Sequence, residues 1–221
     1  MTVQRFKEAV LNKDLLQCVL LAKGMGLDTV YSGLDQLTPL SFAISYGFEE
    51  LVTPLILSGA NVNGKNYNSD APLHLAAEQT NNRICQILLD AGADPNIEGG
   101  AKWTSLHYVS VKGYYDTCHT LIKAKANVNA STDSGVVPLH LACRYGNLGI
   151  CKLLLGAGAN VNVIDSLDMS ALHYSVRWGQ EQIVRLLINF GANKNCTNSY
   201  NYTPYDLAVE RGYMQMAGLL V

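Results

Sequence analysis

Apolar and polar positions recur along the chain with a period of 33 residues. Each copy opens with a short, mostly apolar phrase; the first is TPLSFA and the second is APLHLA. The six phrases begin at Thr38, Ala71, Thr104, Val137, Ser170 and Thr203. Self-similarity at a fixed period of this size is typical of stacked supersecondary units, so the pattern predicts an array of repeats.

Each copy predicts a short helix, a turn, a second helix and a projecting loop. A Thr or Ser before Pro, as at Thr38–Pro39, suits the N-cap and the first position of a helix. A second apolar stretch and then an Asn- and Asp-rich passage follow, and the latter predicts a turn or hairpin. The glycines that should end the first helices are Gly47, Gly113, Gly146, Gly179 and Gly212.

Leucines at one repeat position predict the core. Two-turn helices are marginal on their own, so stability has to come from stacking, where each buried leucine contributes about 2 kcal/mol. These leucines are Leu40, Leu73, Leu106, Leu139 and Leu172. The pattern therefore predicts an all-α repeat solenoid.

The motifs T-P-L-H-x-A and G-A-[ND]-x-N, together with the 33-residue period, resemble those of ankyrin repeats. The second motif occupies residues 59–63, 92–96, 158–162 and 191–195. The resemblance implies an elongated, curved stack of helix-turn-helix-hairpin units, with a concave partner-binding face formed by hairpins and first helices. Thr80 and Lys125 depart from the pattern because each stands where other copies have glycine.

The repeat phase also predicts the domain organisation. We expect residues 1–28 to form an N-terminal capping repeat of two amphipathic helices and residues 29–221 to form the array, in a single continuous domain. The last unit, which opens at Thr203, is incomplete and no more polar than an internal unit. Because a stack needs a water-tolerant end, either something covers this end or it frays, and of the two we expect a chain that is a piece of a longer protein.

Composition excludes several classes of protein. The chain carries 16 Lys and Arg against 18 Asp and Glu, so it lacks the basic excess of a nucleic-acid-binding protein. It has neither a secretory signal nor an apolar run long enough to cross a bilayer. We therefore expect no nucleic-acid partner and no membrane insertion, a cytoplasmic location with the nucleus as the alternative, and a chain that is monomeric alone.

Cysteine and histidine both follow the repeat, which favours structural roles. Cys85, Cys118 and Cys151 lie 33 residues apart, as expected of buried, reduced thiols. One histidine per unit recurs along a line, roughly 10 Å apart, and cannot converge on a metal ion. These histidines are His74, His107, His140 and His173.

The two neighbouring aspartates Asp165 and Asp168 lie in one hairpin, where Asx turns account for their presence. With no catalytic motif present, we predict no catalytic residues, no metal and no cofactor.

Residues that the repeat does not dictate are the candidates for binding. Arg144-Tyr145 and Arg177-Trp178 are successive copies of a cation-plus-aromatic pair, and such residues dominate interface hot spots. We predict a non-enzymatic scaffold or adaptor that binds an extended protein segment with acidic and apolar side chains across the third to fifth units. The predicted partner-binding residues are Tyr46, Tyr67, Trp103, Lys112, Arg144, Tyr145, Met169, Arg177, Trp178, Tyr202 and Arg211.

Three alternatives stay open at this level. The Arg and aromatic side chains would serve only packing if they stack on neighbouring repeats. The chain would instead be a regulatory or substrate-recognition domain if it belongs to a larger protein, such as a ubiquitin-ligase adaptor or a channel. The chain would be an enzyme or a metal-binding module if it turned over a substrate or bound zinc in a stoichiometric amount.

Overall fold

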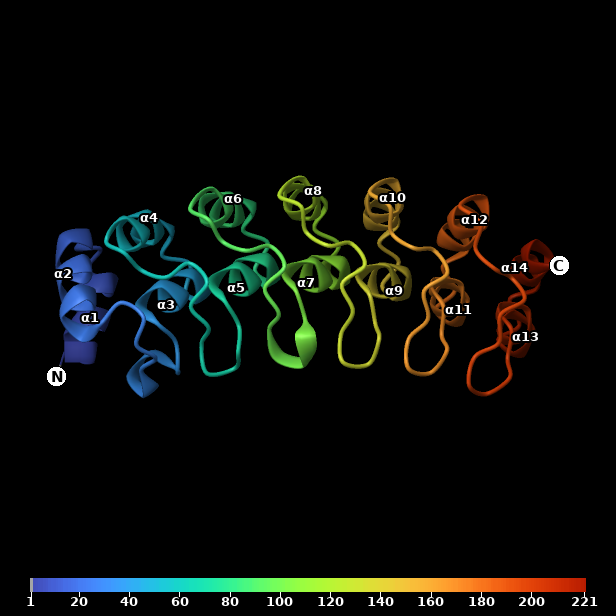
Figure 1. Cartoon of the computed structure of the whole chain (residues 1–221), viewed down its shortest axis with the longest axis horizontal. Coiled ribbons are helices and arrows are strands. Elements are labelled where there is room, and N and C mark those ends of the chain that lie inside the picture. The colour runs from blue at the N-terminus through green and yellow to red at the C-terminus, as the bar shows by residue number, and fades with distance from the viewer. Residues whose placement is uncertain (1) are drawn as a thin grey trace. The chain divides into compact units, whose positions relative to one another are not determined.

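The computed structural model describes residues 2–221 of the chain. Within this range the regular elements are α-helices and two 3-10 helices, and the loops between them carry only isolated β-bridges (Figure 1). The predicted all-α repeat fold is thereby confirmed. None of these helices has the length and apolar character needed to cross a membrane.

The residues group into two compact units, residues 1–100 (unit 1) and residues 101–221 (unit 2). The single continuous domain that the unbroken repeat phase predicts stays a prediction. In a repeat stack each element packs only against its neighbours, so no common core holds distant repeats together. A regular sequence period therefore does not ensure a single compact body.

Unit 1 contains the helices of the predicted capping repeat and of the first two 33-residue copies. Helix α3 packs against α5, and α4 packs between α2 and α6, so first and second helices form two layers. The elements are α1 (Thr2–Leu11), α2 (Leu15–Met25), the 3-10 helix η1 (Ser32–Leu34), α3 (Pro39–Ser45), α4 (Glu49–Leu57), α5 (Pro72–Glu78) and α6 (Asn82–Asp90).

Unit 2 repeats the same arrangement. First helices α7, α9, α11 and α13 pack in succession, second helices α8, α10, α12 and α14 form the other layer, and the loops project beyond the first helices (Figure 1). The bounds are α7 (Ser105–Lys112), α8 (Tyr115–Lys123), α9 (Pro138–Arg144), α10 (Leu148–Gly156), α11 (Ala171–Arg177), α12 (Glu181–Asn189), α13 (Pro204–Glu210) and α14 (Met214–Leu220). The second 3-10 helix, η2 (Gly100–Lys102), includes the last residue of unit 1.

The first helices begin where the sequence predicts. The Thr38 hydroxyl accepts a hydrogen bond from the backbone N–H of Ser41 at 3.1 Å, and Pro39 takes the first helical position. Ala71 and Val137 have no hydroxyl for this role. In their copies the histidine three residues on accepts a hydrogen bond from the N-cap N–H instead, which is the reciprocal half of a capping box.

The predicted core residues are buried in both units. Leu40 retains 1% of its surface, and the four equivalent leucines that follow it along the chain retain 0%. Cys85, Cys118 and Cys151 are also buried at 0% exposure, as the repeat phase predicts. Burial raises the pKa of Cys85 and of Cys118 to about 12, which keeps both thiols protonated and unreactive at neutral pH.

Candidate functional site

Each repeat histidine connects the start of its helix to the following hairpin. In His140, Nδ1 accepts the backbone N–H of Val137 at 3.3 Å, and Nε2 donates to the carbonyl of Val163 at 3.0 Å. His173 bonds Ser170 and Tyr202 in the same way. Burial lowers the pKa of His74, His140 and His173, which favours the neutral ring with its proton on Nε2.

These histidines therefore position the hairpins and leave no free nitrogen for a metal. Within residues 2–221, no group of three or more His, Cys, Asp or Glu side chains has an arrangement that could hold a metal ion. The predicted binding residues lie on these hairpins and at the ends of the first helices.

The predicted binding residues divide between the two units. Tyr46 ends α3 and is 53% exposed, while Tyr67 lies in the loop before α5 and is 74% exposed. Both belong to unit 1, whereas the other nine belong to unit 2. Trp103 is half-buried, with its ring 5.1 Å from that of Tyr108. The predicted residues exposed in unit 2 are Lys112, Arg144, Tyr145, Arg177, Trp178, Tyr202 and Arg211.

Arg144 lies against two aromatic rings. Its guanidinium carbon is 5.4 Å from the ring centre of Tyr145 and 5.1 Å from that of Trp178. Tyr145 and Trp178 are the C-cap residues of α9 and α11, so the arginine reaches from one first helix to the next. Both rings remain 48% exposed. We call Arg144, Tyr145 and Trp178 the Arg144 cluster.

Basic side chains follow one another along the same ends of the first helices. Lys112 ends α7, Arg177 ends α11 and Arg211 caps α13, at positions that correspond to Arg144 or its neighbour in the repeat. Within residues 2–221 two ion pairs form, Lys102–Asp133 and Arg185–Glu181, and neither uses these side chains. Lys112, Arg144, Arg177 and Arg211, which we call the basic row, are exposed and lie outside these two ion pairs.

The sequence reasoning missed a polar contact beneath this surface. The Tyr174 hydroxyl donates to Asp165 Oδ2 at 2.7 Å, and the Tyr174 ring stacks on His140 at 5.2 Å. Burial, reinforced by the Asp165 carboxylate, raises the pKa of Tyr174, while the charges of Arg144 and Arg177 lower it. The signal in the sequence was a tyrosine after the repeat histidine, where the copies at His74 and His140 have leucine.

Asp165 is therefore a structural residue. Its Oδ1 accepts the backbone N–H of Leu167 and of Met169, both at 2.9 Å, as the Asx-turn explanation predicts. The carboxylate is 7% exposed and already bonded on both oxygens. It holds the hairpin before α11.

The prediction that Met169 contributes to the binding surface is wrong. Its side chain is 3% exposed, and its sulfur accepts a hydrogen bond from the side-chain amide of Asn198 at 3.3 Å. The bonds from Asp165 fix the backbone at Met169, and the thioether fills space beside the next hairpin. An apolar hairpin residue can pack against a neighbouring hairpin, and sequence spacing does not distinguish this from exposure.

Comparison with known proteins places these features in a family. A family model described as ankyrin repeats, in three copies, matches residues 6–99, 97–165 and 139–221. A human protein, transient receptor potential cation channel subfamily A member 1, is 41% identical over 63 residues, which make up 28% of this chain and 6% of the channel. Mouse Rabankyrin-5 is 41% identical over 64 residues, 29% of this chain and 5% of that protein.

An enzyme also shares a short segment with the chain. L-asparaginase of Dirofilaria immitis is 36% identical over 56 residues, 25% of this chain and 10% of the enzyme. The chain thus spans only a small part of each of these relatives, and their activities do not transfer with so short a match. The family matches together run from residue 6 to residue 221, and the chain belongs to the ankyrin-repeat family.

Proposed function

We propose that the chain is a non-enzymatic protein-interaction module that binds an acidic, partly apolar protein segment through unit 2. Ankyrin repeats generally act as protein–protein interaction modules. The observation that carries it is the Arg144 cluster, in which a guanidinium stacks on two half-exposed rings. We place this activity in the cytoplasm or the nucleus.

The contacts with the Tyr145 and Trp178 rings orient the Arg144 guanidinium before a carboxylate binds. The planar guanidinium holds its five N–H donors in a fixed fork, and the ring contacts limit the conformations that binding would otherwise have to restrict. A carboxylate of a partner would accept two parallel hydrogen bonds from this fork. An apolar neighbour in the partner would cover the exposed faces of Tyr145 and Trp178, since Trp, Tyr and Arg are enriched among the few residues that carry most of the binding energy at interfaces.

The contacts of the Arg144 cluster also agree with an alternative explanation, in which the Arg and aromatic side chains only pack on neighbouring repeats. Arg144 does stack on Trp178 of the next repeat. However, Lys112, Arg177 and Arg211 are exposed at related positions, outside both ion pairs of the described chain. Unit 2 has 10 Lys and Arg against 7 Asp and Glu, so its charge also favours an acidic partner. Packing and partner binding are compatible roles for Arg144.

A binding experiment tests this proposal. Partners are captured from native cells with the whole chain and identified by mass spectrometry, and their acidic segments are synthesised as labelled peptides. We expect Arg144→Ala and Trp178→Ala each to weaken the peptide Kd by about 30-fold, the loss expected at a hot spot. Arg185→Ala is the matched control, since Arg185 is exposed on α12 and paired with Glu181 at 2.8 Å. Affinity equal to wild type in both cluster variants would contradict the proposal.

A second candidate is a recognition or regulatory segment of a larger protein, such as a channel or a ubiquitin-ligase adaptor. The similarity to 63 residues of a cation channel favours it. Immunoblotting of native cells with an antibody to unit 2 separates the cases. A band far above the 24.0 kDa of this chain supports the larger protein, and a band at that mass contradicts it.

A further inference from the structure

Unit 1 contains a pocket of about 190 Å³ lined by aromatic rings and one carboxylate. The ring centre of Phe42 lies 4.6 Å from that of Tyr46 and 6.2 Å from that of Phe48. The Tyr46 hydroxyl donates a hydrogen bond to the Asp35 carboxylate, which fixes an acidic group beside the rings. We call this the aromatic pocket; its lining residues are Lys7, Val10, Leu11, Asp35, Phe42 and the rings of Tyr46 and Phe48.

The aromatic pocket already attracts a cation from its own chain. The Lys7 ammonium lies over the Phe42 ring, 5.8 Å from its centre. The face of an aromatic ring is electron-rich, and a nearby carboxylate adds to its attraction for a positive charge. Tyr46 is 53% exposed, so its ring remains open to a cation supplied from outside.

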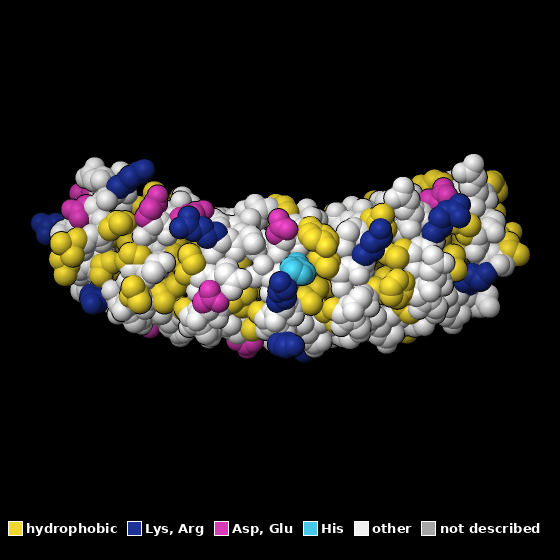
Figure 2. Space-filling view, turned by 90° about the horizontal axis from the view of Figure 1, so that it is seen from above, with side chains coloured by type: hydrophobic (Ala, Val, Ile, Leu, Met, Phe, Trp, Pro, Cys, Tyr) yellow, Lys and Arg dark blue, Asp and Glu magenta, His cyan; other side chains and the backbone are white. Residues whose placement is uncertain are grey.

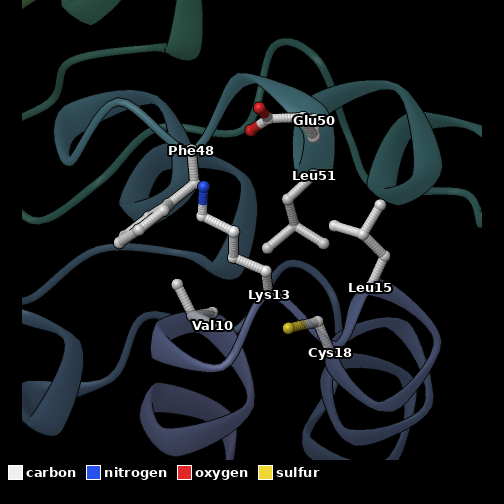
Figure 3. A pocket seen from close by; sticks show the side chains of 7 residues that line it. All are labelled: Val10, Lys13, Leu15, Cys18, Phe48, Glu50 and Leu51. Atoms are coloured by element: carbon white, nitrogen blue, oxygen red, sulfur yellow. The ribbon is translucent and has the colours of Figure 1, made fainter.

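A second pocket adjoins the first. It has a volume of about 110 Å³ and is lined by side chains of α1, α2 and α4 and of the turns before α2 and α4 (Figure 3). Leu15, Cys18 and Leu51 form its apolar part, while Lys13 and Glu50 supply charged groups. Val10 and Phe48 line both pockets, which makes the two neighbours on one surface. We call this second one the leucine pocket.

Exposed leucines lie on α1 and α2, and one of them, Leu11, lines the aromatic pocket. Leu11 is 75% exposed, Leu16 72% and Leu20 56%. Figure 2 shows hydrophobic side chains gathered over this N-terminal part of the chain, with charged groups among them. Large apolar side chains clustered on a surface, rimmed by charge, mark interaction sites more often than isolated ones do.

Charge indicates which partner fits. Residues 1–100 contain 6 Lys and Arg against 11 Asp and Glu, so unit 1 is acidic. We propose that the aromatic and leucine pockets together bind an extended peptide segment in which an arginine or lysine stands next to an apolar residue. The basic side chain stacks on Tyr46 and pairs with Asp35, and the apolar one enters the leucine pocket. This site is chemically opposite to the Arg144 cluster, and it shares no residue with that cluster.

A peptide selection with the whole chain tests this inference. The probe is a random peptide library displayed on phage, and enriched peptides are measured by fluorescence anisotropy. We expect enrichment of peptides that place Arg or Lys beside an apolar residue. Asp35→Asn should weaken their Kd about tenfold by removing the charge that the partner's cation pairs with. Asn tolerates the positive φ of 53° at this position and can still accept the Tyr46 hydroxyl.

Matched variants control for nonspecific effects. Asp90→Asn removes the same charge from an exposed position at the end of α6, and it should leave the Kd within about twofold. Leu11→Ser, at the edge of the aromatic pocket, should weaken binding, whereas Leu57→Ser, 83% exposed outside both pockets, should not. Thermal unfolding of each variant confirms that it is folded.

Three results would overturn the inference. One is a selection that yields no basic-apolar peptides, and another is an equal Kd for Asp35→Asn and Asp90→Asn. The third is binding that is lost in Arg144→Ala but retained in Asp35→Asn, because it would assign the peptides to unit 2. Failure of the proposed function, in contrast, would leave the Asp35-dependent binding unchanged.

Discussion

At the scale of single residues, the buried repeat histidines make the stability of the protein depend on pH. Nδ1 of His140 accepts a backbone N–H and its Nε2 donates to the carbonyl of Val163. Protonation would remove the acceptor at Nδ1 and place a charge in a buried site. Protonation of His74 and His173 would also place a charge in a buried site, and burial lowers the pKa of both.

We therefore predict that the protein loses stability as the pH falls below about 6.5, the ordinary histidine pKa. Below that pH the unfolded chain binds protons that the native histidines resist, so the free energy of unfolding decreases, by at most about 1.4 kcal/mol per pH unit for each histidine. Urea unfolding at about pH 7.5 and about pH 5.5 measures the change. His140→Gln should reduce this dependence and the exposed control His119→Gln should not; equal dependence in the two variants would refute the explanation.

At the scale of elements, the turn that separates first and second helices requires a left-handed residue. Gly47, Gly146 and Gly179 occupy it with φ of 74°, 75° and 72°. In the copy that contains α5 and α6, Thr80 takes this conformation at φ 66°. A β-branched residue is strained there, because its Cβ crowds the backbone.

We predict that Thr80→Gly stabilises the protein by about 1 kcal/mol, the order of the left-handed penalty that it removes. The loss of the Thr80 hydroxyl should matter little because the residue is exposed. The reciprocal variant, Gly47→Thr, should destabilise by a similar amount through backbone strain, since nothing lies within 4 Å of an added Cβ. Chemical unfolding compares the variants, and a neutral or destabilising Thr80→Gly would show that the strain is absent.

At the scale of the whole molecule, the net charge is small because the charges of the two units are opposite in sign. The formal charge of −2 combines an acidic unit 1, with 6 basic and 11 acidic residues, and a basic unit 2, with 10 and 7. Fields of opposite sign attract different partners and mainly change association rates. The two proposed sites follow this division, the basic-peptide site in unit 1 and the acidic-peptide site in unit 2.

We predict that an acidic peptide captured by unit 2 associates more slowly as salt rises from about 50 mM to about 500 mM, while its dissociation rate changes less. Stopped-flow fluorescence measures both rates. Replacing Lys112 and Arg211 by Gln should flatten the salt dependence without removing the Arg144 cluster. An association rate that does not respond to salt would contradict electrostatic steering by the basic row.

Local periodicity in the sequence was sufficient to predict the helices, their 33-residue spacing and the buried leucines. It also predicted the structural role of the histidines and the exposed Arg144-Tyr145 and Arg177-Trp178 pairs. These features repeat because each copy packs on a neighbour like itself, so a residue's position in the period is enough to define its environment.

Only the tertiary structure decided the orientation of side chains at positions that do not repeat. It buried Met169, joined Tyr174 to Asp165 and divided the chain into two units. It also brought Lys7 of α1 over Phe42 of α3 and placed Val10 and Phe48 between two pockets. Such contacts join residues distant in sequence and depend on rotamers and neighbouring volumes, which a periodic pattern does not encode.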